Sequence, residues 1–162
     1  MLSLVKAGYT QNEGGKEANM METMDTATKG RSRIFIVDDN VELLEELENL
    51  LRSGDYDVTA ICDGTQVFEA ALRKKPDLIL LDLKMAPKSG FQIADEIRSS
   101  LALKDVPVVA MTGFYTEKQH FLMMKLSGIK TFILKPFRPL NLISKIEFVL
   151  GNNPEGSGCD GA

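Results

Sequence analysis

Three acids, a hydroxyl and an ammonium group could together hold a metal ion and a phosphoryl group. They belong to Asp38, Asp39, Asp82, Thr112 and Lys135, and each lies at or just after the end of a short apolar run. Three carboxylates at close range repel one another unless a cation lies between them, and Mg²⁺ binds a few carboxylate oxygens while keeping several waters. A lysine ammonium is a point charge suited to a phosphoryl group. If the apolar runs are neighbouring strands, these residues predict a site for Mg²⁺ and a small phosphoanion.

The apolar runs alternate with amphipathic segments along the chain. Continuous apolar or β-branched runs predict strands over residues 33–37, 57–61, 77–81, 106–111 and 131–134. Helical spacing of apolar residues predicts helices over residues 41–52, 65–75, 90–101, 117–126 and 140–150. Strand and helix repeated five times predict an α/β sandwich whose parallel sheet has helices on both faces. Sites in such sheets lie beyond the carboxyl ends of the strands, which is where the five polar residues fall.

Composition limits the class of protein. The chain has 162 residues, of which 44% are hydrophobic and 26% charged, and this predicts one globular domain. Its net charge of −4 argues against a nucleic-acid partner, which calls for a basic face. No apolar run approaches the roughly 20 residues of a membrane span. Two cysteines make no disulfide framework, so we expect a cytoplasmic protein.

The two ends differ in composition from the middle of the chain. Residues 1–31 and 151–162 are polar, contain several glycines and show no sustained apolar period. We therefore expect a disordered leader over 1–31, a structured domain over 32–150 and a flexible tail over 151–162. Few residues follow position 150, so we expect the domain to stand alone. Methionines within the leader leave open a later translation start.

Four motifs carry a resemblance to a known family. They are Ile-Val-Asp-Asp at 36–39, Leu-Leu-Asp-Leu-Lys-Met at 80–85, Val-Ala-Met-Thr-Gly at 109–113 and Phe-Ile-Leu-Lys-Pro-Phe at 132–137. Together they resemble the receiver domain of two-component response regulators, over about residues 32–150. The resemblance implies a flavodoxin-like (βα)5 three-layer sandwich with a five-stranded parallel sheet of order 2-1-3-4-5.

The resemblance also implies a phosphoacceptor and a metal site. Asp82 is similar to the aspartate that the family phosphorylates. Asp39 and Asp82 resemble the direct Mg²⁺ ligands, and Asp38 resembles the acid that holds the metal through water. The backbone carbonyl of Lys84 is implied as a further ligand. The phosphoryl group would come from a histidine kinase or a phosphotransfer protein, so the chain would be a signalling protein that transfers and hydrolyses only its own phosphoryl group.

Further residues resemble the family's switch. Thr112 and Lys135 are similar to the groups that bind the phosphoryl oxygens, and Phe132 occupies the position of a switching aromatic residue. The resemblance implies a cis peptide bond between Lys135 and Pro136. Output would pass to an unknown partner protein through the face made by residues 117–126, 131–134 and 140–150.

Simpler interpretations remain open at this stage. Aspartates cap helices and form turns, threonine before glycine forms turns, and lysine is commonly a surface residue. Phe132 could be a core residue, and we expect residues 121–124, Phe-Leu-Met-Met, to lie mostly in the core. The chain could also be a pseudo-receiver that binds partners without phosphorylation, a phosphorelay intermediate or a phosphate sink. A haloacid-dehalogenase-like phosphatase would need Asp-x-Asp after the first strand, and a flavodoxin-like flavoprotein would need a phosphate loop there.

Overall fold

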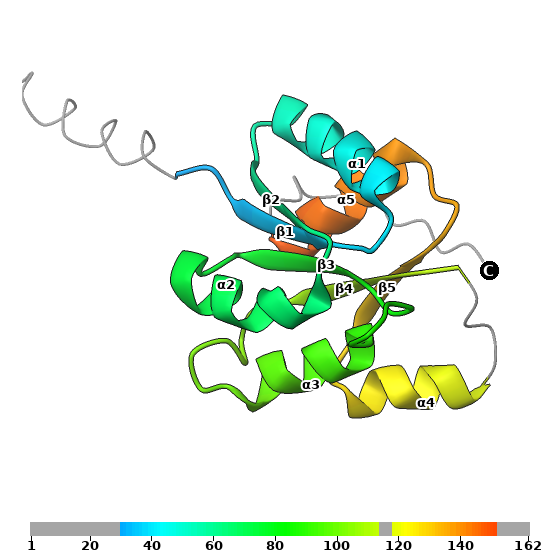
Figure 1. The fold of residues 1–162 in the computed structure, drawn as a ribbon. Helices are drawn as coiled ribbons and strands as arrows, with labels where there is room; N and C mark the ends of the chain where they lie inside the picture. Colours follow the sequence, from blue (N-terminus) through cyan, green and yellow to red (C-terminus); the bar gives the residue numbers. More distant parts are fainter. Residues whose placement is uncertain (1–29, 114–117, 152–162) are drawn as a thin grey trace, which may run out of the picture. The chain divides into compact units, whose positions relative to one another are not determined.

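A computed structural model describes residues 30–113 and 118–151, apart from the side chains of residues 118–120 (Figure 1). The strands are β1 (Arg33–Val37), β2 (Asp57–Ile61), β3 (Leu78–Asp82), β4 (Val108–Thr112) and β5 (Thr131–Leu134). The helices are α1 (Val41–Ser53), the 3₁₀ turn η1 (Gly64–Gln66), α2 (Val67–Lys74), α3 (Gly90–Ser99), α4 (Lys118–Leu126) and α5 (Pro139–Val149). The predicted leader and tail fall outside the described residues, except at their inner ends.

All neighbouring strands pair in parallel, in the order β2-β1-β3-β4-β5. Helices α1 and α5 cover one face of the sheet, and α2, α3 and α4 cover the other (Figure 1). The predicted flavodoxin-like three-layer sandwich and its strand order are confirmed. None of the described helices is long and apolar enough to cross a membrane.

Each face of the sheet has its own buried cluster, because successive strand residues point to opposite sides. Ile34 and Ile36 of β1 pack with Leu47 of α1 on one face. Phe35 and Val37 pack with the helices of the opposite face. This alternation also assigns a face to each polar residue at the carboxyl end of the sheet.

Two predicted strands begin too early. The prediction of 106–111 is wrong by two residues at its start, because the Val106 N–H donates to Leu103 in the turn after α3 and Pro107 has no N–H to donate. The prediction of 77–81 is shifted by one residue, since the Asp77 carboxylate accepts from the backbone N–H of Arg33 at 2.7 Å. The strand instead continues to Asp82.

The expectation that residues 121–124 lie mostly in the core is wrong for three of them. Met124 is 3% exposed, whereas Phe121, Leu122 and Met123 are 43%, 58% and 45% exposed. A helix lying on one face of a sheet buries only one side. Since α4 is apolar on several sides, its sequence does not identify the side that is covered.

Candidate functional site

The pairing register brings the predicted site residues to one edge of the sheet. Val37 pairs with Leu81, so Asp38 lies level with Asp82 on the neighbouring strand. Asp82 pairs with Met111, which precedes Thr112, and the Lys135 backbone N–H donates to the Thr112 carbonyl at 2.7 Å. One carboxylate oxygen from each of the three acids lies within 4.8 Å of the others. Residues far apart in the sequence thus form one polar cluster.

Lys135 bridges two of the acids. Its Nζ lies 2.5 Å from Oδ2 of Asp38 and 3.1 Å from Oδ1 of Asp82. The two carboxylates are nearly buried, with side chains 2% and 9% exposed, while the lysine side chain is 24% exposed. Buried carboxylates require a counter-charge, and Lys135 supplies one positive charge for the pair.

The first acid of the cluster is held by the turn that leads into α1. Oδ1 of Asp38 accepts a hydrogen bond from the Asn40 N–H at 2.9 Å, and the Asn40 side chain accepts from the Leu43 N–H at 3.1 Å. Asn40 is therefore the cap of α1, and the interpretation of Asp38 or Asp39 as its cap is wrong. The sequence contains the signal for this cap, because Asn40 stands directly before the periodic apolar run of the helix.

A glycine sets the shape of the loop after Asp82. The Gly90 N–H donates to the Leu83 carbonyl at 3.2 Å as α3 begins. A Cβ on Gly90 would lie 2.2 Å from the Asp82 carbonyl oxygen and 2.7 Å from the Leu83 Cα, so only glycine fits. Ser89 caps α3 through a capping box with Gln92, which fixes the direction in which the loop returns.

Burial and neighbouring charges shift the pKa values of Asp82 and Lys135 for different reasons. Burial raises the pKa of Asp82, the charge of Lys135 opposes this, and the charge of Asp38 adds to the rise. For Lys135, burial alone would lower the pKa, but the hydrogen bond and charge of Asp38, with the charge of Asp82, outweigh it and raise the pKa. The cluster therefore stabilises the charged form of Lys135 and destabilises the charged form of Asp82.

The hydroxyl at the site has an unusual environment. Thr112 is 1% exposed, and its Oγ1 has no hydrogen-bond partner among the described residues. By strand alternation Thr112 points to the same face as Ala110, which packs towards α2, α3 and α4. Phe132 lies on that face too, half-buried, with its ring edge-on to Phe121 at 5.6 Å and 64°. Phe132 is thus not part of the acidic cluster.

Comparison with known proteins identifies the family. The family described as the response regulator receiver domain matches residues 34–147. This chain belongs to the response regulator receiver family. The receiver is 34% identical over 132 residues to the DNA-binding response regulator MtrA of Mycobacterium tuberculosis, which covers 82% of this chain and 55% of MtrA. It is 33% identical over 118 residues to the transcriptional regulatory protein BaeR of Escherichia coli, covering 73% of this chain and 48% of BaeR. The chain thus spans about half the length of these relatives.

Solved structures share the fold of the receiver. The Vibrio cholerae chemotaxis protein CheY4 matches with a TM-score of 0.70 and 24% identity, over 74% of this chain and 98% of CheY4. The receiver domain of the sensor histidine kinase PA1611 from Pseudomonas aeruginosa matches with a TM-score of 0.69 and 28% identity, over 75% of this chain and 98% of that chain. The PA1611 structure has a magnesium ion coordinated in its active-site cleft.

The donor atoms of this receiver fit the same kind of ion. Mg²⁺ takes oxygen ligands at about 2.0–2.1 Å in an octahedron, so opposite ligands lie about 4 Å apart. The oxygens of Asp38, Asp39 and Asp82 lie within 4.8 Å of one another, and a cation among them would relieve their mutual repulsion. The Lys84 carbonyl, two residues beyond Asp82, remains a predicted ligand. The Lys135–Pro136 peptide bond is cis, as is Ala86–Pro87.

Proposed function

We propose that this receiver accepts a phosphoryl group on Asp82 from a phosphohistidine of a histidine kinase or phosphotransfer protein. Mg²⁺ would be held by Asp38, Asp39, Asp82 and the Lys84 carbonyl. One observation carries the proposal: a nearly buried carboxylate lies within 4.8 Å of two others and 3.1 Å from the Lys135 ammonium. Two-component signalling uses this combination of acid, metal site and lysine, and the chain belongs to that family.

The transfer is a displacement at phosphorus. An oxygen of Asp82 attacks the phosphorus atom, the bond from phosphorus to the donor's imidazole nitrogen breaks, and the electron pair leaves with that nitrogen. The product is an acyl phosphate on Asp82. Bound Mg²⁺ supplies positive charge where three carboxylates and a phosphoryl group meet. The attacking group is the carboxylate form of Asp82, which carries its own lone pair, so the step itself transfers no proton.

Thr112 and Lys135 are proposed to hold the phosphoryl oxygens. A phosphoryl group brings strong acceptor oxygens and extra negative charge. Lys135 can donate from beside Asp82. The Thr112 hydroxyl, which has no partner within residues 30–113 and 118–151, gains one by turning towards the phosphoryl group. Movement of Thr112 frees space on its face of the sheet, and Phe132 turns into that space. The surface of α4, β5 and α5 thereby changes for an output partner.

Acetyl phosphate and Mg²⁺ test this proposal. Intact-mass analysis should show a gain of one phosphoryl group on the wild-type receiver, no gain for Asp82→Asn, and little gain when the metal is chelated. Asp105→Asn is the matched control, because it makes the same chemical change at an exposed aspartate outside the cluster. An equal gain on Asp82→Asn would refute the assignment. No gain on the wild type would favour the pseudo-receiver, and repeated turnover of a phosphoester would favour a phosphatase.

A further inference from the structure

The loop between β3 and α3 covers residues 83–89 and contains Lys84, whose carbonyl is a predicted Mg²⁺ ligand. Backbone hydrogen bonds hold the two ends of this loop, where Leu83 continues the pairing with β4 and Ser89 caps α3. Within the described part of the chain, residues 85–88 make no hydrogen bond from backbone to backbone. The middle of the loop is therefore held by side-chain contacts.

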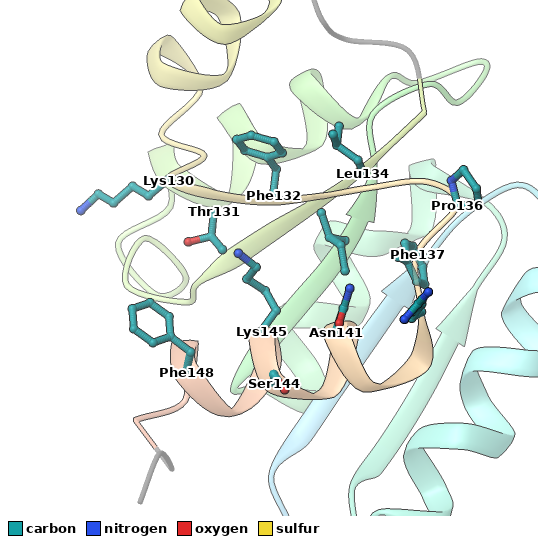
Figure 2. A pocket seen from close by; sticks show the side chains of 12 residues that line it. Lys130, Thr131, Phe132, Leu134, Pro136, Phe137, Asn141, Ser144, Lys145 and Phe148 are labelled. Atoms are coloured by element: carbon teal, nitrogen blue, oxygen red, sulfur yellow. The ribbon is translucent and has the colours of Figure 1, made fainter. Parts of the chain in front are cut away.

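The loop after β5, which carries Lys135 into the same site, is held differently. The Lys135 N–H donates to the Thr112 carbonyl at 2.7 Å. Figure 2 shows the chain running directly from β5 through Pro136 and Phe137 into α5, and Phe137 packs against the buried cluster beneath α1 and α5. Lys135 thus has a backbone anchor of the kind that residues 85–88 lack.

An ion pair ties the middle of the β3–α3 loop to the helix that follows it. The Lys88 ammonium donates a hydrogen bond to Oε2 of Glu96, which lies in the second turn of α3. The side chain of Lys88 is 20% exposed and that of Glu96 is 43% exposed, so water screens this pair only in part. The pair fixes the end of the loop side chain to a rigid element.

The backbone at Lys88 also lies against the turn after β2. A Cβ on Gly64 would lie 3.2 Å from the Lys88 carbonyl oxygen and 3.2 Å from Cε of Met85, so η1 packs directly on the loop. Met85 is 8% exposed and belongs to the cluster beneath α2 and α3. Lys88 is therefore in contact with both η1 and α3, four residues along the loop from Lys84.

A Mg²⁺ ion makes the position of this loop important. The ion requires oxygen ligands at about 2.0–2.1 Å in nearly ideal octahedral geometry, so a carbonyl ligand must be held within a fraction of an ångström. Groups that orient a ligand without touching the metal change the metal affinity when they are replaced. We infer that Lys88 and Glu96 are positioning residues, which hold the Lys84 carbonyl where it can bind Mg²⁺. The inference rests on the proposed function, in which that carbonyl is a ligand.

The charge of Lys88 gives this inference a distinctive sign. A cation near a Mg²⁺ site repels the metal, so removal of a lysine that acted by charge alone would tighten Mg²⁺ binding. Removal of a lysine that positions a ligand would weaken it. Lys88→Met keeps most of the length of the side chain and removes the charge, so the direction of its effect distinguishes the two roles.

NMR titration of the full chain with Mg²⁺ tests the inference without any phosphoryl transfer. Lys88→Met and Glu96→Gln should each weaken Mg²⁺ binding by about three-fold or more. The double variant should bind Mg²⁺ about as well as either single variant, because both changes break the same ion pair. Lys88→Arg keeps a cation for Glu96 and should stay within about two-fold of the wild type.

Two control variants separate this effect from a general change of charge. Glu69→Gln makes the same change as Glu96→Gln at an acid that lines the same groove between α2 and α3 but forms no ion pair with a described residue. Lys104→Met makes the same change as Lys88→Met at an exposed lysine beyond the end of α3. Both controls should bind Mg²⁺ as the wild type does. Urea denaturation without metal checks that each variant is folded, which we expect for Glu96→Gln because Glu96 is exposed.

The inference is overturned if Lys88→Met binds Mg²⁺ as tightly as the wild type or more tightly, or if Lys88→Arg binds as weakly as Lys88→Met. It is also overturned if either control weakens binding as much as its matched variant, or if the two single effects multiply in the double variant. The wild type separates this inference from the proposed function. If the wild type binds Mg²⁺ and gains a phosphoryl group on Asp82 while Lys88→Met and Glu96→Gln bind Mg²⁺ equally well, only the positioning of Lys84 is refuted. A wild type that neither binds Mg²⁺ nor gains mass refutes the proposed function.

Discussion

Replacing Thr112 by valine should stabilise the unphosphorylated receiver. Thr112 is 1% exposed and its hydroxyl has no partner among the described residues, so the wild type bears the cost of an unsatisfied buried group. Mutational data place that cost at about 1–3 kcal/mol, and valine keeps the shape while removing the hydroxyl. We expect the free energy of unfolding to rise by about 1–2 kcal/mol, measured by urea denaturation without metal. For a domain of this size, the midpoint of thermal unfolding should rise by roughly 2–8 °C.

The serine variant is the control for this prediction. Thr112→Ser keeps the hydroxyl and removes a buried methyl group, so it should lower the free energy of unfolding by about 1 kcal/mol. Beryllofluoride and Mg²⁺, which together mimic the phosphoryl group on Asp82, should still shift the NMR signals of α4 and β5 in Thr112→Ser. The same addition should shift these signals less in Thr112→Val. If Thr112→Val is less stable than the wild type, the hydroxyl has a partner in solution, and the reasoning about Thr112 as an unpaired switch group is refuted.

Three other substitutions test the electrostatics and packing of the site. Lys135→Ala removes the ammonium 2.5 Å from Asp38, and Mg²⁺ affinity measured by calorimetry should increase by about five-fold or more; a large loss would show that the lysine is structural. Asp82→Asn should raise the free energy of unfolding of the metal-free protein at pH 7. Burial raises the folded-state pKa of Asp82 against the pull of Lys135, so its contribution to stability is present below the unfolded pKa of about 3.9 and is lost as pH rises through the folded pKa. Urea denaturation at several pH values should therefore show that the free energy of unfolding of Asp82→Asn exceeds that of the wild type by an amount that grows from acidic to neutral pH. A difference that stays constant with pH would contradict this. Gly90→Ala should lower the free energy of unfolding by about 1–3 kcal/mol or more, since its Cβ would lie 2.2 Å from a carbonyl oxygen, whereas Gly30→Ala, with nothing within 4 Å, should be neutral; equal effects would refute the packing argument.

The sequence predicted the sheet well where polar residues mark both ends of a strand. The bounds of β1, β2 and β5 agree with their apolar runs. The start of β4 depends on which residue first pairs with β3, and a run of apolar residues in the sequence does not show where pairing begins. The exposed side of α4 was equally hidden, because Leu122 and Met124 have similar side chains and only the sheet beneath the helix distinguishes them.

The convergence of the site residues followed from strand order, since the carboxyl ends of parallel strands share one edge. The contacts within the cluster did not follow from it. Bridging of Asp38 and Asp82 by Lys135 depends on how far a flexible side chain reaches across neighbouring strands. Whether the Thr112 hydroxyl has a partner depends on the polar groups that surrounding elements bring near it, and the described part of the chain brings none; a sequence motif does not record this.

Borohydride trapping tests the central claim most directly. After incubation with acetyl phosphate and Mg²⁺, sodium borohydride reduces an aspartyl phosphate to homoserine, and peptide mass spectrometry then locates the changed residue. The account predicts homoserine at position 82, none at positions 38 or 39, and none anywhere in a sample treated with a chelator. Homoserine at another aspartate, or an unmodified Asp82 in a sample that has gained a phosphoryl group, would contradict it.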